Sequence, residues 1–174
     1  MKFNNDMLRL YAVTDRHWTG EQTLYEQVRD VLMGGATCLQ LREKDLDEAS
    51  FYEEAKNIKE LCRLFDVPFI INDNVMLAKE IDADGVHVGQ DDMACVKARE
   101  ILGPDKIIGV SAHTIEEARI AKEQGADYLG IGAIFPTSSK DDAEVLGIKR
   151  LKEMTDTVDL PMVAIGGISY DNCL

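Results

Sequence analysis

The feature that most constrains this chain is a regular alternation of short apolar runs with longer segments of helical periodicity. The apolar runs are rich in Val, Ile and Leu, which is typical of parallel strands covered on both faces. Between them, apolar residues such as Leu24, Val28 and Leu32 recur at helical spacing. We therefore expect a parallel α/β sheet, with strands at residues 10–14, 38–42, 68–72, 85–88, 107–111, 128–132 and 161–165.

Two architectures fit this alternation, a doubly wound open sheet and a TIM (β/α)₈-type barrel. The first strand is followed by TDRHW rather than by the glycine fingerprint of an open dinucleotide-binding sheet, which favours the barrel. A complete barrel takes about 200 residues or more, whereas this chain has 174 residues. We expect one barrel domain over residues 1–174, with about seven strands and the last units missing at its C-terminal end.

Composition excludes several classes of function. The chain carries 32 acidic and 19 basic side chains, a net charge of −13, which opposes binding to nucleic acid. It has no run of about 18 apolar residues, so a membrane span is not expected. The four cysteines are scattered without a CxxC pair and fit reduced thiols, which with the lack of a signal peptide predicts a cytoplasmic protein. A homo-oligomer stays open.

Basic side chains follow the second predicted strand. The period of two places Gln40, Arg42 and Lys44 on one face, directed into the mouth of the barrel, where the catalytic groups of such folds gather. An inward arginine needs an anion to offset its desolvation. The alternative is that Arg42 pairs with a neighbouring carboxylate and that Lys44 lies in solvent. Together with the polar residues on the other loops, the pattern favours an anionic ligand.

Two aspartates follow successive strands of the predicted barrel. Asp73 and Asp92 would lie close together, because neighbouring strands are about 4.8 Å apart. Two hard oxygen donors suit Mg²⁺, which usually shares its coordination sphere with waters and a substrate phosphate. We therefore expect a site for Mg²⁺ and a diphosphate. A helix N-cap role for either aspartate is the alternative, and Asp91 competes with Asp92 on spacing alone.

Two late loops have the composition of phosphate-binding loops. Ser138, Ser139 and Lys140 follow the sixth strand, and Gly166 and Gly167 follow the seventh, where barrels commonly bind phosphate. A plain glycine-rich turn is the alternative.

Two histidines and an acidic run complete the predicted rim. His87 and His113 have inward parity, but no Ser or Cys nucleophile motif accompanies them, so we interpret both as hydrogen-bonding packing groups. The acidic run at Asp141 and Asp142 is expected to form a solvated lid loop.

Seven segments, spread in order over nearly the whole chain, together resemble one known family. They are YAVTDR, GGATCLQLREK, PFIINDN, DGVHVGQDD, IGVSAHT, DYLGIGAIFPTSSK and MVAIGGI. The family is thiamine-phosphate synthase, also called thiamine monophosphate pyrophosphorylase. The resemblance implies a TIM barrel that joins hydroxymethylpyrimidine diphosphate to a thiazole phosphate. It further implies that Mg²⁺ assists the release of pyrophosphate and that the reaction passes through a pyrimidine carbocation.

The resemblance also implies roles for individual residues. Asp73 and Asp92, rather than Asp91, would bind the metal. The implied catalytic groups, which act on the departing diphosphate, are Arg42, Lys44, Ser111 and Lys140. The implied substrate-binding residues are Gln40, Leu41, Arg42, Glu43, Lys44, Asn72, Ser111, Thr137, Ser138, Ser139, Lys140 and Gly167. Of these, Asn72 would lie on the pyrimidine side, and Thr137, Ser138 and Ser139 on the thiazole phosphate.

The chain departs from the family pattern in two places. PTSSK stands where PTxTK is commoner, and the final strand with its phosphate-binding turn does not follow Gly167. Two alternatives therefore stay open beside the synthase. One is a thiazole tautomerase, a related barrel that isomerises a thiazole phosphate. The other is a noncatalytic fragment that binds phosphorylated small molecules.

Overall fold

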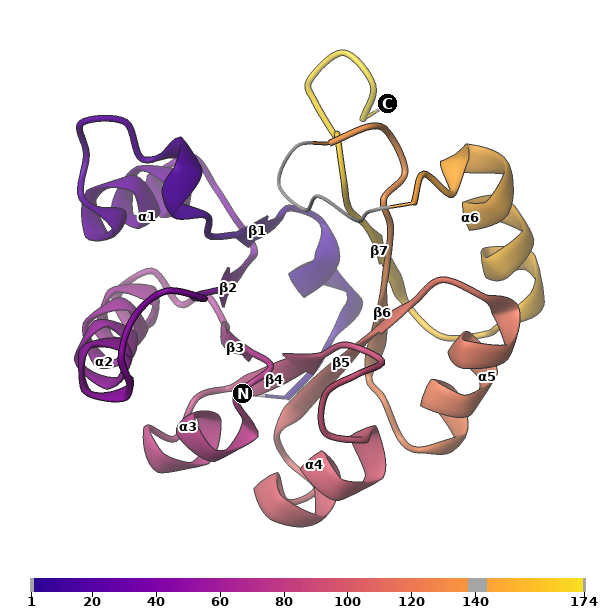
Figure 1. The fold of residues 1–174 in the computed structure, drawn as a ribbon, viewed down its shortest axis with the longest axis horizontal. Coiled ribbons are helices and arrows are strands. Elements are labelled where there is room, and N and C mark those ends of the chain that lie inside the picture. The colour runs from indigo at the N-terminus through magenta and orange to yellow at the C-terminus, as the bar shows by residue number, and fades with distance from the viewer. Residues whose placement is uncertain (1, 138–143, 174) are drawn as a thin grey trace.

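Seven parallel strands form one curved sheet in the computed structural model, which describes residues 2–137 and 144–173. Each strand pairs with its neighbours in sequence, so the order runs from β1 to β7 around a nearly closed barrel (Figure 1). The strands are β1 (Tyr11–Val13), β2 (Cys38–Leu41), β3 (Phe69–Asn72), β4 (Gly85–Val88), β5 (Ile107–Ala112), β6 (Tyr128–Ile131) and β7 (Met162–Ala164). The predicted TIM-type barrel is confirmed, and each strand end lies within one residue of the expected position.

Helices cover the outside of the ring of strands (Figure 1). They are α1 (Leu24–Met33), α2 (Glu48–Leu64), α3 (Val75–Glu80), α4 (Cys95–Leu102), α5 (Ile115–Glu123) and α6 (Gly147–Thr157), with short 3₁₀ helices η1 (Asn5–Leu8) and η2 (Arg16–Trp18). Local sequence sets several of the starting points. Thr23 and Glu26 form a capping box at α1, and Asp47 caps α2 through the Ser50 N–H.

The apolar core has an outer and an inner layer, because alternate strand residues point to opposite faces of the sheet. The outer layer packs strand residues such as Leu41 and Leu129 against the helices. Inside the barrel, Ile70 and Tyr128 pack with Met7 of η1. The N-terminal segment, indigo in Figure 1, thus lies inside the ring of strands, where Met7 and Phe3 belong to the inner apolar layer.

Two glycines make room for large side chains inside the barrel. A Cβ at Gly109 would lie 2.1 Å from Cζ of Tyr128 and 2.5 Å from Nδ1 of His87. A Cβ at Gly130 would lie 2.9 Å from Cε1 of His87. The rings of His87 and Tyr128 therefore occupy space that any other residue at these two strand positions would fill.

Replacing Gly109 by alanine tests this packing. We expect Gly109→Ala to lower the free energy of unfolding by about 1–3 kcal/mol or more, because one of the two rings must move from its place. The matched control is Gly34→Ala, where the nearest atom to the added Cβ is a backbone oxygen at 3.3 Å and φ is −73°. Denaturant unfolding measures both, and an equal effect in the two variants would contradict the packing explanation.

Candidate functional site

Three successive loops bring a lysine and two aspartates together at the C-terminal ends of the strands. Lys44 follows β2, and its Nζ lies 2.5 Å from Oδ2 of Asp73, which follows β3. The carboxyl group of Asp92, in the loop after β4, lies within hydrogen-bonding reach of Asp73. Asp92 Oδ2 also accepts a hydrogen bond of 2.8 Å from the Gly89 N–H. The two aspartates expected to meet therefore do so.

The electrostatics of this pair show an excess of negative charge. Partial burial raises the pKa of Asp92, and the hydrogen bond and repulsion from Asp73 raise it further. The Gly89 N–H and the charge of Lys44 oppose that rise. A cation beside the two carboxylates would relieve the repulsion.

Neither aspartate caps a helix, so that alternative is wrong. Asn74 caps α3 by accepting a 2.9 Å hydrogen bond from the Leu77 N–H, and α4 follows Ala94, which makes no side-chain cap. Asp73 itself has a positive φ of 62°, a backbone conformation that aspartate tolerates better than most residues.

The donor set fits a magnesium ion better than a metal that needs a complete protein cage. Across residues 2–137 and 144–173, no three His, Cys, Asp or Glu side chains are grouped so as to hold a metal ion. Mg²⁺ commonly takes one or two carboxylates and completes its octahedron with waters and substrate phosphates. Asp73 and Asp92 offer that number of ligands.

The pairing that the salt-bridge alternative gave to the two cations after β2 is wrong, because Lys44 rather than Arg42 pairs with a carboxylate. Arg42 is half-buried, and its guanidinium has no carboxylate partner in the described part of the chain, whereas Lys44 is the one ion-paired. The Arg42 backbone is fixed by Thr14, whose Oγ1 accepts from the Arg42 N–H at 2.9 Å and donates to the Arg42 carbonyl at 3.2 Å. The head group of Arg42 is thus available to an anion.

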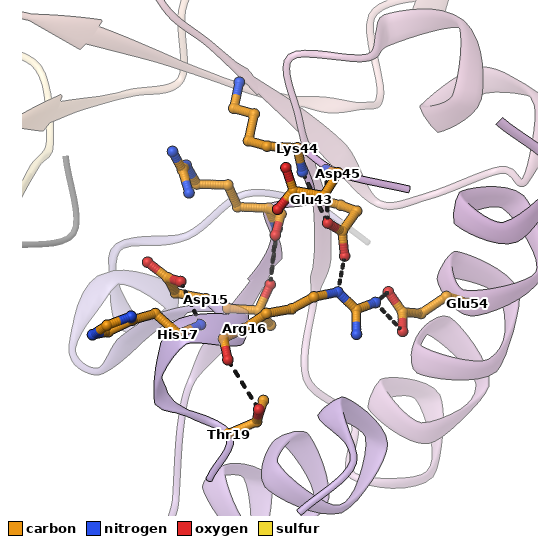
Figure 2. A network of polar contacts seen from close by, with 10 residues as sticks. Asp15, Arg16, His17, Thr19, Glu43, Lys44, Asp45 and Glu54 are labelled. Carbon is orange, nitrogen blue, oxygen red and sulfur yellow. Dashed lines mark hydrogen bonds and ion pairs between the residues drawn. The ribbon is translucent and has the colours of Figure 1, made fainter. Parts of the chain in front are cut away.

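Glu43 has a structural partner and is turned away from its two basic neighbours. Its Oε2 lies 2.5 Å from Nε of Arg16, whose Nη2 lies 2.7 Å from both carboxylate oxygens of Glu54 on α2 (Figure 2). Burial alone would raise the pKa of Glu43, but hydrogen bonds from the Asp45 N–H, Arg16 and the Lys44 N–H together lower it. Arg16 therefore clamps the loop after β2 against α2. The sequence analysis gave Arg16 no role, although it is the last residue of the segment YAVTDR.

Residues 40–44 face three different ways. Leu41 is fully buried in the outer core, so its side chain is not available to a ligand. A cleft of about 360 Å³ lies beside the loop and is lined by Asp15, Arg16, His17, Arg42, Glu43, Lys44 and Asp45. Asn72, at the C-terminal end of β3, is half-buried. The basic pair borders this open space, while Gln40 points into the barrel interior.

A chain of hydrogen bonds runs through that interior. Gln40 Nε2 donates to the Tyr11 hydroxyl at 2.9 Å, and the hydroxyls of Tyr11 and Tyr128 are 2.6 Å apart. The Tyr128 hydroxyl lies 3.1 Å from Nδ1 of His87, and His87 Nε2 lies 2.9 Å from Oγ of Ser111. Ser111 is near the end of β5, so the chain ends toward the mouth.

The two histidines differ in their surroundings. Burial lowers the pKa of His87 to about 4, against a smaller opposite effect of Asp92, so the ring is neutral near pH 7. Its predicted role as a hydrogen-bonding packing group is confirmed. His113 is wrong as a packing group: β5 ends one residue earlier, and the His113 side chain is 44% exposed with Nδ1 3.4 Å from Oε2 of Glu117.

The late loops are described only in part. Ser138, Ser139, Lys140 and the acidic run at Asp141 and Asp142 lie outside the described residues. Thr137 is half-buried beside them. Gly167 has φ +63°, and a Cβ there would lie 2.5 Å from the carbonyl oxygen of Pro136, so the β7 loop packs closely on the β6 loop. Packing and backbone conformation thus require a glycine at this position.

None of the helices within residues 2–137 and 144–173 combines the length and the apolar character needed to cross a bilayer.

Known proteins of one family are similar to this chain over nearly its whole length. The model of the thiamine monophosphate synthase family matches residues 10–173. A thiamine-phosphate synthase of Clostridium acetobutylicum is 49% identical over 94% of this chain and 78% of its own length. One from Desulfitobacterium hafniense is 51% identical over 94% of this chain and 79% of its own length.

A solved structure agrees in sequence and fold. Thiamine phosphate pyrophosphorylase from Pyrococcus furiosus superposes with a TM-score of 0.86 at 42% identity, covering 97% of this chain and 79% of that one. The chain therefore spans roughly four-fifths of the relatives it matches.

The Arg16 clamp yields a prediction on stability. We expect Arg16→Ala to lower the free energy of unfolding by about 1–3 kcal/mol, because Glu43 keeps its buried carboxylate and loses a charged donor. Hydrogen exchange at the Lys44 and Asp45 amides should also become faster. Arg9→Ala is the matched control, since Arg9 pairs with Asp6 on a surface where both side chains are about 75% exposed. Equal losses in the two variants would refute the clamp.

The buried His87 yields a prediction on pH dependence. Its folded pKa of about 4 lies below the usual value near 6.5 in the unfolded chain. Below pH 6.5 the unfolded chain therefore binds a proton that the folded protein does not, and stability falls as the pH drops. The expected loss is roughly 3 kcal/mol between pH 7 and pH 4. Urea unfolding across this range should show a steeper decline for the parent protein than for His87→Gln, and parallel curves would disprove the assignment.

Proposed function

The chain belongs to the thiamine monophosphate synthase family and carries its transferase activity, and on this premise we propose which residues of the rim perform the reaction. That reaction couples 4-amino-5-hydroxymethyl-2-methylpyrimidine diphosphate to a thiazole phosphate, and it yields thiamine phosphate and pyrophosphate. Both substrates are phosphorylated small molecules. The observation that carries the proposal is the meeting of Lys44, Asp73 and Asp92 from three successive loops beside a half-buried Arg42.

The diphosphate belongs beside these groups. Arg42 and Lys44 supply positive charge next to an open cleft, and the protein as a whole carries a net charge of −13 that repels anions. Binding of two phosphorylated substrates therefore needs local cations. Asp73 and Asp92 would hold Mg²⁺, which when bound supplies further positive charge to the leaving diphosphate.

The remaining assigned residues surround the two organic groups. Asn72, at the end of β3, and Gln40, deeper in β2, lie on the pyrimidine side. Ser111 donates a hydrogen bond to the diphosphate, and Lys140 adds a further cation. The thiazole phosphate is assigned to Thr137, Ser138, Ser139 and Gly167.

The reaction requires stabilisation of the negative charge on the departing diphosphate and no proton transfer in the bond-forming step. The bond between the pyrimidine methylene carbon and the diphosphate oxygen breaks, and both electrons leave with the oxygen. The lone pair of the thiazole nitrogen then forms the new C–N bond to that carbon. Lys44 is held by its ion pair with Asp73 and Ser111 by its hydrogen bond with His87, so both stabilise the negative charge on the departing oxygen with little reorganisation, and the head group of Arg42 adds further positive charge. The bond-forming step demands no general base.

The contact of Asp73 with Asp92 supports this reaction over one of the two alternatives. A thiazole tautomerase moves a proton within one substrate and has no use for paired aspartates beside two cations. A noncatalytic phosphate-binding fragment would carry the same pair, so the release of pyrophosphate is what distinguishes it from the synthase.

Neutralising either aspartate tests the proposal. We expect Asp73→Asn and Asp92→Asn each to lower the rate of thiamine phosphate formation about 100-fold or more and to raise the Mg²⁺ concentration needed for half-maximal activity. Asp91→Asn is the matched control, and its rate should stay within about twofold of the parent, because loss of a surface charge perturbs little.

The measurement is release of pyrophosphate from both substrates with Mg²⁺ varied, with circular dichroism to show that each variant is folded. Turnover that is insensitive to Mg²⁺, or an Asp91→Asn defect as large as that of Asp92→Asn, would overturn the assignment.

A further inference from the structure

The hydrogen-bonded chain inside the barrel has one member whose role is fixed, the Gln40 amide, and a direction can be argued from it. The amide nitrogen Nε2 of Gln40 is a hydrogen-bond donor and not an acceptor, so it donates to the Tyr11 hydroxyl. Because the Tyr11 oxygen already accepts there, we assign its own proton to the Tyr128 oxygen 2.6 Å away, which is a better acceptor than the nearby Cys38 thiol. Tyr128, having accepted, has its proton left for Nδ1 of His87.

The same logic continues to the mouth. A neutral imidazole has one acceptor and one donor nitrogen, so an accepting Nδ1 leaves the proton on Nε2. His87 Nε2 then donates to Oγ of Ser111 at 2.9 Å. Because the Ser111 oxygen accepts from inside, its own O–H is left to point elsewhere. The reverse direction would draw the Ser111 proton inward and turn only lone pairs toward the mouth.

One neighbour of the chain competes only weakly. Cys38 lies within hydrogen-bonding reach of the Tyr11 hydroxyl. A thiol is a poor donor and acceptor, so it does not displace the 2.6 Å bond between the two tyrosines. In the part of the chain that the structure describes, no buried side-chain nitrogen or oxygen atom lacks a partner.

The fold reserves space for this chain at three adjacent strands. Gly109 of β5 pairs with both His87 of β4 and Tyr128 of β6 in the strand register. A Cβ at Gly109 would enter the contact between the two rings, and one at Gly130 would press on the His87 ring. The two glycines therefore stand at the strand positions where a side chain would displace the ring of His87 or Tyr128.

We propose that Gln40, Tyr11, Tyr128 and His87 are positioning residues that hold the Ser111 hydroxyl as a hydrogen-bond donor toward the substrate diphosphate. The inference rests on the proposed function for Ser111 as the ligand of that diphosphate. Tyr11, Tyr128 and His87 lie behind Ser111 and act through its oxygen, whereas Gln40, assigned above to the pyrimidine side, takes part in this chain as its first donor. A donor fixed in this way stabilises an anionic leaving group, whereas a freely rotating hydroxyl offers that group a donor only part of the time.

The direction of the chain is measured on the resting protein. In ¹⁵N NMR of the histidine rings, we expect His87 to carry its proton on Nε2 and to leave Nδ1 bare. The protein has three histidines, and the signals that vanish in His87→Gln identify the ring. Gln40→Glu should reverse the chain, because a carboxylate accepts the Tyr11 proton, and should move the His87 proton to Nδ1. A parent protein with His87 protonated on Nδ1 would overturn the proposal.

The consequence for catalysis is measured with Tyr128→Phe, which keeps the ring and removes the hydroxyl. We expect kcat to fall about 10-fold to 100-fold, the usual worth of a hydrogen bond to a charged group, with little change in KM for the thiazole phosphate. Tyr128→Phe in a Ser111→Ala background should cost nothing further, because its effect passes through Ser111. Tyr25→Phe, on the outer helix α1 and 44% exposed, is the matched control and should match the parent.

The NMR and the kinetic measurements distinguish failure of the positioning role from failure of the proposed function. Independent, multiplicative losses from Tyr128→Phe and Ser111→Ala would show a structural role for Tyr128 and would overturn the positioning role. A parent protein that binds its substrates but releases no pyrophosphate would refute the proposed function, while the ring protonation of His87 would still decide the direction of the chain.

Discussion

Parallel pairing of seven strands in sequence order is the constraint on which the rest of this structure depends. Every strand runs the same way, so every loop that follows a strand opens on one rim. Lys44, Asp73 and Asp92 are far apart in the chain, yet they leave consecutive strands and therefore meet. The rim concentrates both signs of charge in a protein that is strongly acidic overall, and this local arrangement is what suits phosphorylated substrates.

Beneath the rim, the interior of the barrel is divided along its axis. One end is apolar, closed by Met7 and by Phe3, whose ring stacks on Tyr128 with centroids 6.0 Å apart. Above it lie the hydroxyls of Tyr11 and Tyr128 and the ring of His87, joined in one chain. Tyr128 belongs to both parts, since its ring packs in the apolar layer and its hydroxyl enters the polar one. The groups at the mouth of the barrel are thus held from below by packed apolar side chains and by a continuous chain of hydrogen bonds.

Much of this could be predicted from the sequence, because its signals are local. A strand of period two, a glycine turn and a helix cap each involve a few neighbouring residues, so the strand ends were located to within a residue. The sequence does not show which side chains of different loops pair with one another. Arg42 and Lys44 are both basic and share one strand face, and nothing local says that Lys44 takes the carboxylate of Asp73 while Arg42 stays unpaired in the described structure. His113 shows the same limit, since parity fails once the strand has ended.

The sequence by itself determined the barrel, the rim and the identity of the groups that can reach it, because periodicity and motif order are properties of the chain. Tertiary structure decided which of those groups contact one another. Arg16 could be matched to Glu43 and Glu54 only when the loops after β1 and β2 were placed beside α2. The direction of the chain from Gln40 to Ser111 likewise depends on side chains from five strands meeting inside the barrel. Hydrogen bonds and ion pairs act over a few ångströms in space, and separation along the sequence does not fix that distance.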